Sequence, residues 1–169
     1  MLALILTAAV QAAASADADP LALARKGMQQ CYAPNLSAKT CQSLAGYVFE
    51  ADGTIINTAE VLIASSPVVT LKTAEPVIVK SGAVCGQLSD FHDAEVFVGG
   101  KTADPAVSAK VREQLLAAMA PILGKEICTY YLQGNGAMSA SATLDGQPAP
   151  AMTTTVLWIA PTDGYSVRP

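Results

Sequence analysis

The first sixteen residues constrain the fold most, because they predict an export signal that is removed from the chain. Residues 2–10 are uncharged and, apart from Thr7, apolar, and residues 11–16 supply the small side chains that a signal peptidase requires. The 10 basic and 14 acidic residues all lie after this stretch. We therefore expect cleavage near Ala16, a mature chain that begins at Asp17, and a periplasmic or secreted location.

Two other interpretations of residues 1–16 stay open. No Lys or Arg precedes the apolar run, so a short buried helix is an alternative, although a helix that is apolar on every side has no polar face for water. A membrane anchor is disfavoured, because the run is about half of the roughly 20 residues needed to span a bilayer. We expect no membrane span in the mature chain.

Four cysteines follow the predicted signal: Cys31, Cys41, Cys85 and Cys128. An even number of cysteines in an exported chain is typical of a disulfide framework. Of the three possible pairings, we favour Cys31–Cys41 with Cys85–Cys128. The first pair closes a short loop, and the cysteines of the second pair both lie in strand-like segments. The spacing matches neither the C-x2–4-C pattern of zinc sites nor the C-x-x-C redox motif, which disfavours metal ligation and redox catalysis.

The charges of the chain exclude some classes of partner. The net charge is −4, and Arg25 and Lys26 are the only adjacent basic residues. A surface that binds nucleic acid requires clustered basic residues, and so does a surface that binds an anionic membrane electrostatically. We therefore expect neither a nucleic acid nor a membrane surface as a partner. The apolar fraction of 51% is enough for one core, which predicts a single domain over residues 17–169.

Two segments predict helices, and each begins with Asp-Pro. An Asp at the N-cap accepts hydrogen bonds from the amides of the first turn, and a Pro in that turn loses no needed donor. The first segment covers residues 19–30 and has apolar residues on one face. The second and longer one begins after Asp104; we expect it to end near Pro121, with Gly124 as its C-terminal cap.

Alternating apolar and polar residues predict strands elsewhere. The Asp52-Gly53 pair between two apolar runs is a strong hairpin signal. The expected strands cover residues 47–49, 55–64, 69–72, 76–79, 84–85 and 95–98, followed by a meander over 127–133, 137–144 and 153–159. Strands joined by tight turns, with two helices far apart in the sequence, predict an α+β fold: a mainly antiparallel sheet with an N-terminal helix, one longer central helix and two disulfides.

The best candidate for a reactive site is the stretch 90–95, where the one histidine, His92, lies among Asp90, Asp93 and Glu95. A carboxylate beside an imidazole orients it and raises its basicity, as an acid–base or metal site requires. The alternative is a solvated loop, which we favour because four residues so close in sequence cannot all face one ion. The nucleophile elbow, the phosphate-binding loop and the dinucleotide fingerprint are absent, so we expect no cofactor.

Four short segments resemble those of uncharacterised small exported bacterial proteins with a disulfide-stapled domain. They are GAVCG at 82–86, AMAP at 118–121, KEIC at 125–128 and DGY at 163–165. The resemblance implies the bacterial envelope rather than a eukaryotic secretory route, and it implies no active-site residue.

These observations favour a non-enzymatic soluble domain that binds an envelope protein or a small ligand. One alternative is a hydrolase or metal-dependent enzyme centred on His92, and another is a purely structural or stress-protective protein. Tyr130, Tyr131 and Trp158 could line a binding face, although aromatic residues of neighbouring strands are more often core. Carboxylates, Ser or Tyr converging on His92 in a deep cleft would favour the enzyme.

Overall fold

The computed structural model describes residues 19–133 and 138–169. The predicted export signal and the predicted turn at 134–136 lie outside the described residues. Within these residues the chain forms one α-helix, three short 3-10 helices and strands of two sheets.

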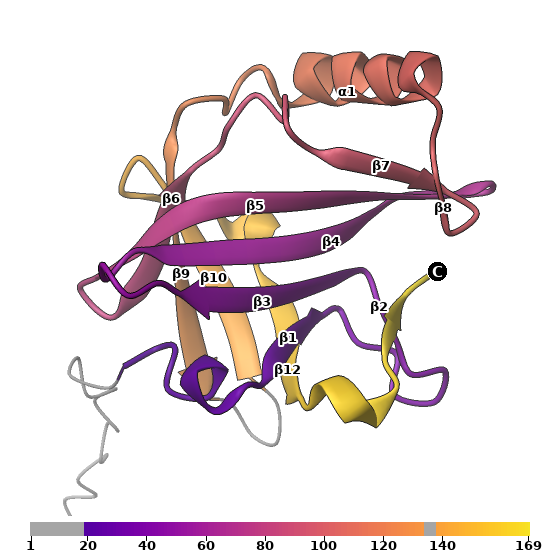
Figure 1. Ribbon diagram of the computed structural model, residues 1–169. Helices are drawn as coiled ribbons and strands as arrows, with labels where there is room; N and C mark the ends of the chain where they lie inside the picture. Colours follow the sequence, from indigo (N-terminus) through magenta and orange to yellow (C-terminus); the bar gives the residue numbers. More distant parts are fainter. Residues whose placement is uncertain (1–18, 134–137) are drawn as a thin grey trace, which may run out of the picture.

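Eight strands of the described chain form a closed antiparallel barrel (Figure 1). They are β1 (Gln29–Tyr32), β3 (Ser43–Phe49), β4 (Ile55–Ser65), β5 (Val68–Lys80), β6 (Ala83–Gln87), β9 (Glu126–Gln133), β10 (Met138–Leu144) and β12 (Thr154–Ile159). The order around the barrel is β4-β3-β1-β12-β10-β9-β6-β5, and β5 pairs with β4 to close it. Closure gives the backbone groups of these strands partners on both sides over most of the circumference.

The remaining elements extend or cover this barrel. They are η1 (Ala24–Lys26), β2 (Thr40–Cys41), β7 (Glu95–Val98), β8 (Lys101–Thr102), α1 (Pro105–Met119), β11 (Gln147–Pro148), η2 (Pro150–Met152), η3 (Pro161–Asp163) and β13 (Ser166–Val167). Strand β7 pairs with the first part of β5, β8 pairs with β7, and β11 pairs with β10. Strands β2 and β13 form a separate two-stranded parallel sheet.

The apolar core has two main parts, one beside η1 that continues inside the barrel and one beneath α1; η1 and α1 lie on opposite sides of the molecule (Figure 1). On one side Leu21, which is 0% exposed, and Ala24 of η1 pack with Val84 of β6. Partly buried side chains around them are Tyr47, Phe49, Ile55, Val77, Tyr131 and Trp158. On the other side α1 lies over β5 and β7. Its apolar residues Val111, Leu115, Leu116 and Met119 pack against a cluster that contains Val69, Leu71, Phe91, Ala94 and Val96.

The predicted α+β fold is wrong, because the sheet closes into a barrel and the described chain has one α-helix, not two. The predicted N-terminal helix over residues 19–30 is replaced by turns, η1 and β1. Asp19 does accept the expected hydrogen bond from the Leu21 amide, but Gly27 has φ +83° and ends the helical segment after one turn. So short a helix is marginal alone, whereas pairing in β1 satisfies the backbone on two sides.

Two boundary predictions are also wrong. Residues 76–79 are no separate strand, because β5 continues through Pro76. Strand β6 pairs with β5 only from Ile78 onward, so Pro76 lies where β5 has a free edge and a missing N–H is tolerated. Gly124 does not cap α1: the helix ends at Met119 with Ala120 as its C-cap.

Several local predictions are confirmed. The Asp52-Gly53 turn joins β3 to β4, the three-strand meander is β9, β10 and β12, and α1 begins after Asp104. The side chain of Asp104 accepts from the amides of Ala106 and Val107, both at 3.0 Å. The two disulfides join Cys31 to Cys41 and Cys85 to Cys128, as predicted. No α-helix in the described ranges has the length and apolar character needed to cross a membrane.

Candidate functional site: a groove at a gap in the barrel wall

The barrel wall is open between β5 and β6. Strand β6 pairs with β5 over only three positions, from Ile78 to Lys80, and then follows β9. Strand β7 pairs with the same edge of β5, but nearer the start of β5, from Val69 to Lys72. The segment 73–77 of β5 therefore has a strand partner on one side only, which is β4. The gap arises because β6 and β7 take separate parts of the same long strand.

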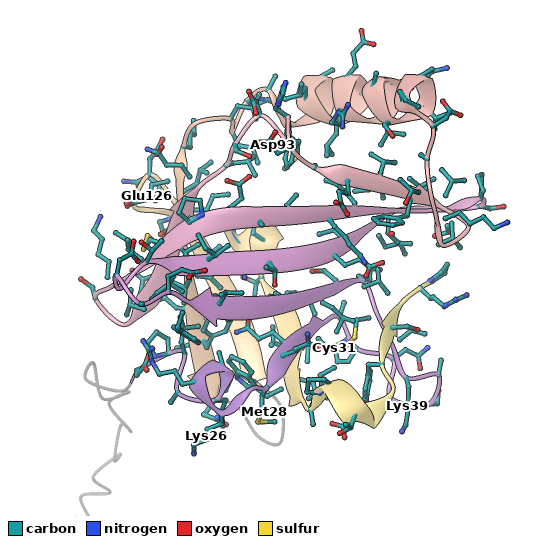
Figure 2. All side chains as sticks on the ribbon, viewed as in Figure 1. Lys26, Met28, Cys31, Lys39, Asp93 and Glu126 are labelled. Atoms are coloured by element: carbon teal, nitrogen blue, oxygen red, sulfur yellow. A yellow bond between two sulfur atoms is a disulfide. The ribbon has the colours of Figure 1, made fainter. Side chains whose placement is uncertain are left out.

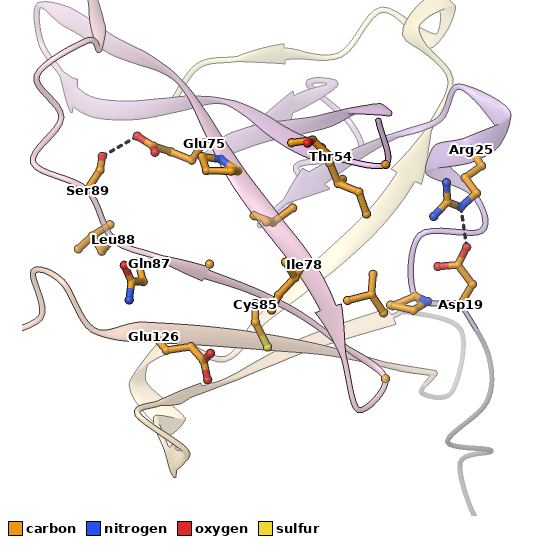
Figure 3. A pocket seen from close by; sticks show the side chains of 18 residues that line it. Asp19, Arg25, Thr54, Glu75, Ile78, Cys85, Gln87, Leu88, Ser89 and Glu126 are labelled. Atoms are coloured by element: carbon orange, nitrogen blue, oxygen red, sulfur yellow. Dashed lines mark hydrogen bonds and ion pairs between the residues drawn. The ribbon is translucent and has the colours of Figure 1, made fainter. Parts of the chain in front are cut away.

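A groove of about 1170 Å³ lies along this gap (Figure 3). A smaller cavity of about 200 Å³ adjoins it and is bounded in part by side chains that face the barrel interior. The two share seven lining residues from β5, β6 and the segment after β6: Glu75, Pro76, Val77, Gly86, Gln87, Leu88 and Ser89. The shared lining places the two spaces next to each other at the gap.

Gly86 allows the two strands to approach closely at the edge of the gap. A Cβ at this position would lie 3.1 Å from Cγ1 of Val77 and 3.5 Å from the carbonyl oxygen of Pro76. A larger residue at Gly86 would push Val77 away and change the shape of the groove.

Glu75 brings a carboxylate to the meeting point of groove and inner cavity. Strand register pairs Glu75 with Asn57, and Asn57 with Tyr47, so these three residues lie on the inner face of the sheet. The side chain of Glu75 is half-buried and accepts a hydrogen bond from Oγ of Ser89, which Figure 3 shows at one end of the groove. The Nδ2 atom of Asn57 donates to the carbonyl oxygen of Gly46 at 3.1 Å, which leaves its side-chain oxygen as an acceptor.

The other charged side chains of the groove have ion-pair partners. Asp19 lies 2.8 Å from Nε of Arg25 at the opposite end of the groove from Glu75 (Figure 3), and Glu126 lies 3.0 Å from Nζ of Lys80. Burial alone would raise the pKa of Asp19. The hydrogen bonds that Asp19 accepts from Arg25 and from the Leu21 amide, together with the positive charge of Arg25, outweigh burial and lower this pKa. Among the described residues Glu75 has no ion-pair partner within 4.0 Å.

A second polar group lies deeper in the barrel, where Gln30 is 0% exposed. Its Oε1 atom accepts hydrogen bonds from the hydroxyls of Tyr32 and Tyr47, each at 3.0 Å, and from Tyr131 at 3.3 Å. Its Nε2 atom has no hydrogen-bond partner in the described structure. Burial, followed by the nearby Tyr131 hydroxyl, raises the pKa values of Tyr32 and Tyr47 far above the ordinary value of 10.0.

The candidate residues around His92 lie on an exposed loop and at the start of β7. The side chain of His92 is 84% exposed and that of Asp93 is 102% exposed, with Nδ1 of His92 3.1 Å from Oδ1 of Asp93. Asp90 accepts from the backbone amide of His92, and Glu95 is exposed on β7. Figure 2 shows Asp93 on the side of the barrel that α1 covers. The structure thus brings His92 and Asp93 within hydrogen-bond distance, and no group of three potential metal ligands among the described residues includes any of the four.

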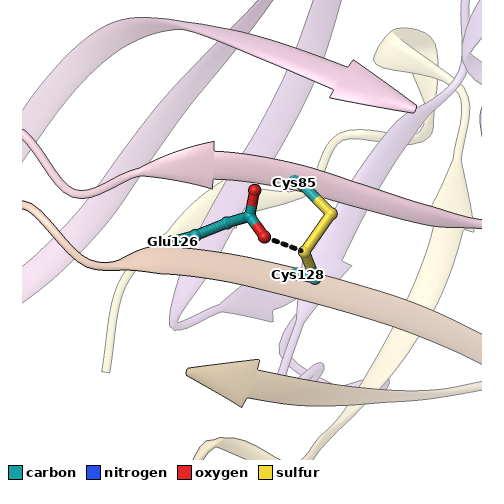
Figure 4. A group of neighbouring side chains, drawn as sticks. All are labelled: Cys85, Glu126 and Cys128. Atoms are coloured by element: carbon teal, nitrogen blue, oxygen red, sulfur yellow. Dashed lines mark hydrogen bonds between the residues drawn. A yellow bond between two sulfur atoms is a disulfide. The ribbon is translucent and has the colours of Figure 1, made fainter. Parts of the chain in front are cut away.

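Cys85, Glu126 and Cys128 do come together on the outer face of β6 and β9 (Figure 4). One carboxylate oxygen of Glu126 lies 3.6 Å from Sγ of Cys128. Because the two sulfur atoms are bonded to each other, neither is a thiolate available to a metal ion. This group is therefore a structural cross-link with a carboxylate beside it.

The three aromatic candidates divide between the two faces of the sheet. Tyr131 and Trp158 lie inside the barrel with ring centroids 6.4 Å apart, and they belong to the core. Tyr130 lies on the other face, against the Cys85–Cys128 disulfide.

Glu75 was not among the predicted site residues, although its position in the sequence carries a weak signal. In this part of β5 every second residue faces the barrel interior, and Glu75 brings a carboxylate into this inward-facing series of Leu71, Thr73, Glu75 and Val77.

Comparisons of the chain with protein-family models, with curated proteins and with solved structures found no match.

Proposed function

We propose that this protein is a non-enzymatic binding protein of the bacterial envelope that takes a small ligand into the groove between β5 and β6. The observation that carries the proposal is the gap in the barrel wall, where an open groove lies next to an inner cavity. Small-molecule sites are concave, mostly apolar and supplied with a few polar groups, and barrels commonly hold ligands in their interiors. The predicted export signal and the two disulfides support an oxidising compartment.

The lining of the groove suits a ligand with an apolar part. Ile78 and Val79 are among the large hydrophobic residues that the described structure exposes, at 58% and 41%, and both line the groove. The inner cavity adds Val84, Phe91 and Ile127. A ligand that covers these side chains gains roughly 25 cal/mol for each Å² of apolar surface removed from water.

An enzyme centred on His92 has less support. An acid–base or metal site needs converging groups in a sheltered cleft, and the imidazole of His92 is 84% exposed beside a single carboxylate. None of the residues that line the groove or its inner cavity is a histidine. The geometry therefore favours binding over turnover.

Binding in the groove can be tested with a neutral fluorescent probe such as Nile red, whose emission increases in apolar surroundings. Gln87 is exposed and lines both spaces, so Gln87→Trp should fill the mouth of the groove. We expect this variant to bind the probe at least about tenfold more weakly, a difference of roughly 1.4 kcal/mol.

The matched control is Thr155→Trp, which adds the same side chain at an exposed position of β12 that does not line the groove. It should bind the probe like the unmodified protein. If the unmodified protein binds no probe, or if both tryptophan variants bind it equally well, the groove is not a ligand site.

A further inference from the structure

We infer that the ligand of the groove is a small organic cation, an ammonium group on an apolar body, and that Glu75 binds its charge. This inference rests on the proposed function and adds the chemical class of the ligand.

Among the described residues, the ion pairs of the groove lining leave one carboxylate uncompensated. Four charged side chains line the groove, and the ion pairs of Asp19 with Arg25 and of Glu126 with Lys80 compensate three of them. Glu75 is the exception within the described chain, and its carboxylate is half-buried. Removing a carboxylate from water is unfavourable unless it is paired, so a ligand that covers Glu75 must bring a positive charge or donors to it.

Hydrogen-bond acceptors exceed free donors around Glu75. The hydroxyl of Ser89 already donates to Glu75, and the amide nitrogen of Asn57 already donates to the backbone of Gly46. One N–H of Asn57 remains, but the Glu75 carboxylate and the Asn57 side-chain oxygen together accept more hydrogen bonds than this group can donate. An ammonium group has donors and no acceptor, so it matches this set.

The lining of the groove does not suit an anionic ligand. The one cationic side chain that lines the groove is Arg25, and it is bonded to Asp19, while its guanidinium lies 4.2 Å from the ring centroid of Phe49. A carboxylate or phosphate ligand would find Glu75 instead of a free cation. The net charge of −4 also attracts cations to the protein and repels anions.

The inner cavity places apolar side chains beside Glu75, which fits a ligand with an apolar body. Beyond Glu75 the side chains that bound this cavity include Val77, Leu88, Phe91 and Ile127. A volume of about 200 Å³ fits a short alkyl chain or a single ring and excludes large ligands from the inner part.

The experiment is a charge series on one ring: benzylammonium, benzyl alcohol and benzoate, measured by calorimetry on the disulfide-bonded protein. We expect benzylammonium to bind at least about tenfold more tightly than benzyl alcohol, and benzoate to bind most weakly. In Glu75→Gln, which keeps the shape and the acceptor for Ser89, the preference for the cation should disappear while affinity for benzyl alcohol stays the same. Glu60→Gln, which removes a carboxylate that is ion-paired with Lys72 and lines neither the groove nor the inner cavity, should keep the preference.

The outcomes separate the inference from the proposed function. If the three probes bind equally, or if Glu75→Gln still prefers benzylammonium, the assignment of a cation to Glu75 is wrong, although binding in the groove stands. The same holds if Nile red binds in the groove and none of the three ring probes does. If neither Nile red nor any ring probe binds, the proposed function fails as well. The series on the unmodified protein is decisive even if Glu75→Gln does not fold.

Discussion

The hydroxyl of Tyr47 donates a hydrogen bond of 3.0 Å to the side-chain oxygen of Gln30 inside the barrel. The same hydroxyl lies 3.3 Å from that of Tyr131, which in turn lies 2.8 Å from that of Tyr32. Four residues from three strands therefore share one buried network. Buried polar groups stabilise a fold when they are paired and destabilise it when they lose a partner, so this network is sensitive to the loss of one hydroxyl.

Tyr47→Phe should lower the free energy of unfolding by about 1 kcal/mol, because it removes one hydroxyl and leaves the ring in the core. Urea unfolding of the disulfide-bonded protein measures the change. The matched control is Tyr130→Phe: Tyr130 lies on the other face of β9, so its loss of a hydroxyl should change stability by less than about 0.5 kcal/mol. Equal stability of the two variants would show that the network does not stabilise the barrel.

The same tyrosines predict a loss of stability at alkaline pH. Burial raises the pKa values of Tyr32 and Tyr47 in the folded state, so an unfolded chain loses these protons at a lower pH than the folded one. Their contribution is complete below pH 10 and falls as the pH rises above it, by up to about 1.4 kcal/mol per pH unit for each tyrosine. Urea unfolding at pH 9, 10 and 11 measures the slope.

The control for this slope is the double variant Tyr32→Phe, Tyr47→Phe. It lacks both buried hydroxyls, so its stability should decrease less steeply above pH 10 than that of the unmodified protein. Parallel curves for the two proteins would contradict the assignment of the alkaline transition to these residues.

Local rules explain the parts of this fold that the sequence predicted. The Asp52-Gly53 turn, the Asp104 cap and the alternation of β10 depend on a few adjacent residues, and each is present. The disulfide pairing followed from one short loop and two strand-like segments. These features need no knowledge of distant contacts.

Closure of the barrel and the groove depend on long-range pairing instead. Nothing near residues 19–30 shows that β1 will lie between β3 and β12, and that pairing overrides the helix signal of Asp19-Pro20. Glu75 becomes part of a site only because β6 leaves β5 at Ile78. The stretch around His92 has the composition of a reactive site, whereas the place of Glu75 at the gap depends on the pairing of β5 with β6 and β7.

The two disulfides should differ in their contribution to stability. Cys85 and Cys128 are 43 residues apart in sequence and Cys31 and Cys41 are 10 apart, so their loops restrict the unfolded chain by about 4 and about 2.8 kcal/mol. Replacing Cys85 and Cys128 together by Ala should therefore cost more than replacing Cys31 and Cys41. Urea unfolding of the two double variants, each with its remaining disulfide intact, checks the order, and a reversed order would contradict the loop-entropy explanation.

His92→Ala should change the free energy of unfolding by less than about 0.5 kcal/mol, because the imidazole is 84% exposed and its nearest side-chain partner is the equally exposed Asp93. A metal ion that binds the folded state raises the melting temperature, so a zinc titration separates a solvated loop from a metal site. With both disulfides intact, we expect zinc to shift the melting temperatures of the unmodified protein and of His92→Ala equally, since no described group of three potential ligands includes His92. A zinc-dependent increase in the unmodified protein that His92→Ala lacks would refute the solvated loop and would move the enzyme hypothesis ahead of the binding protein.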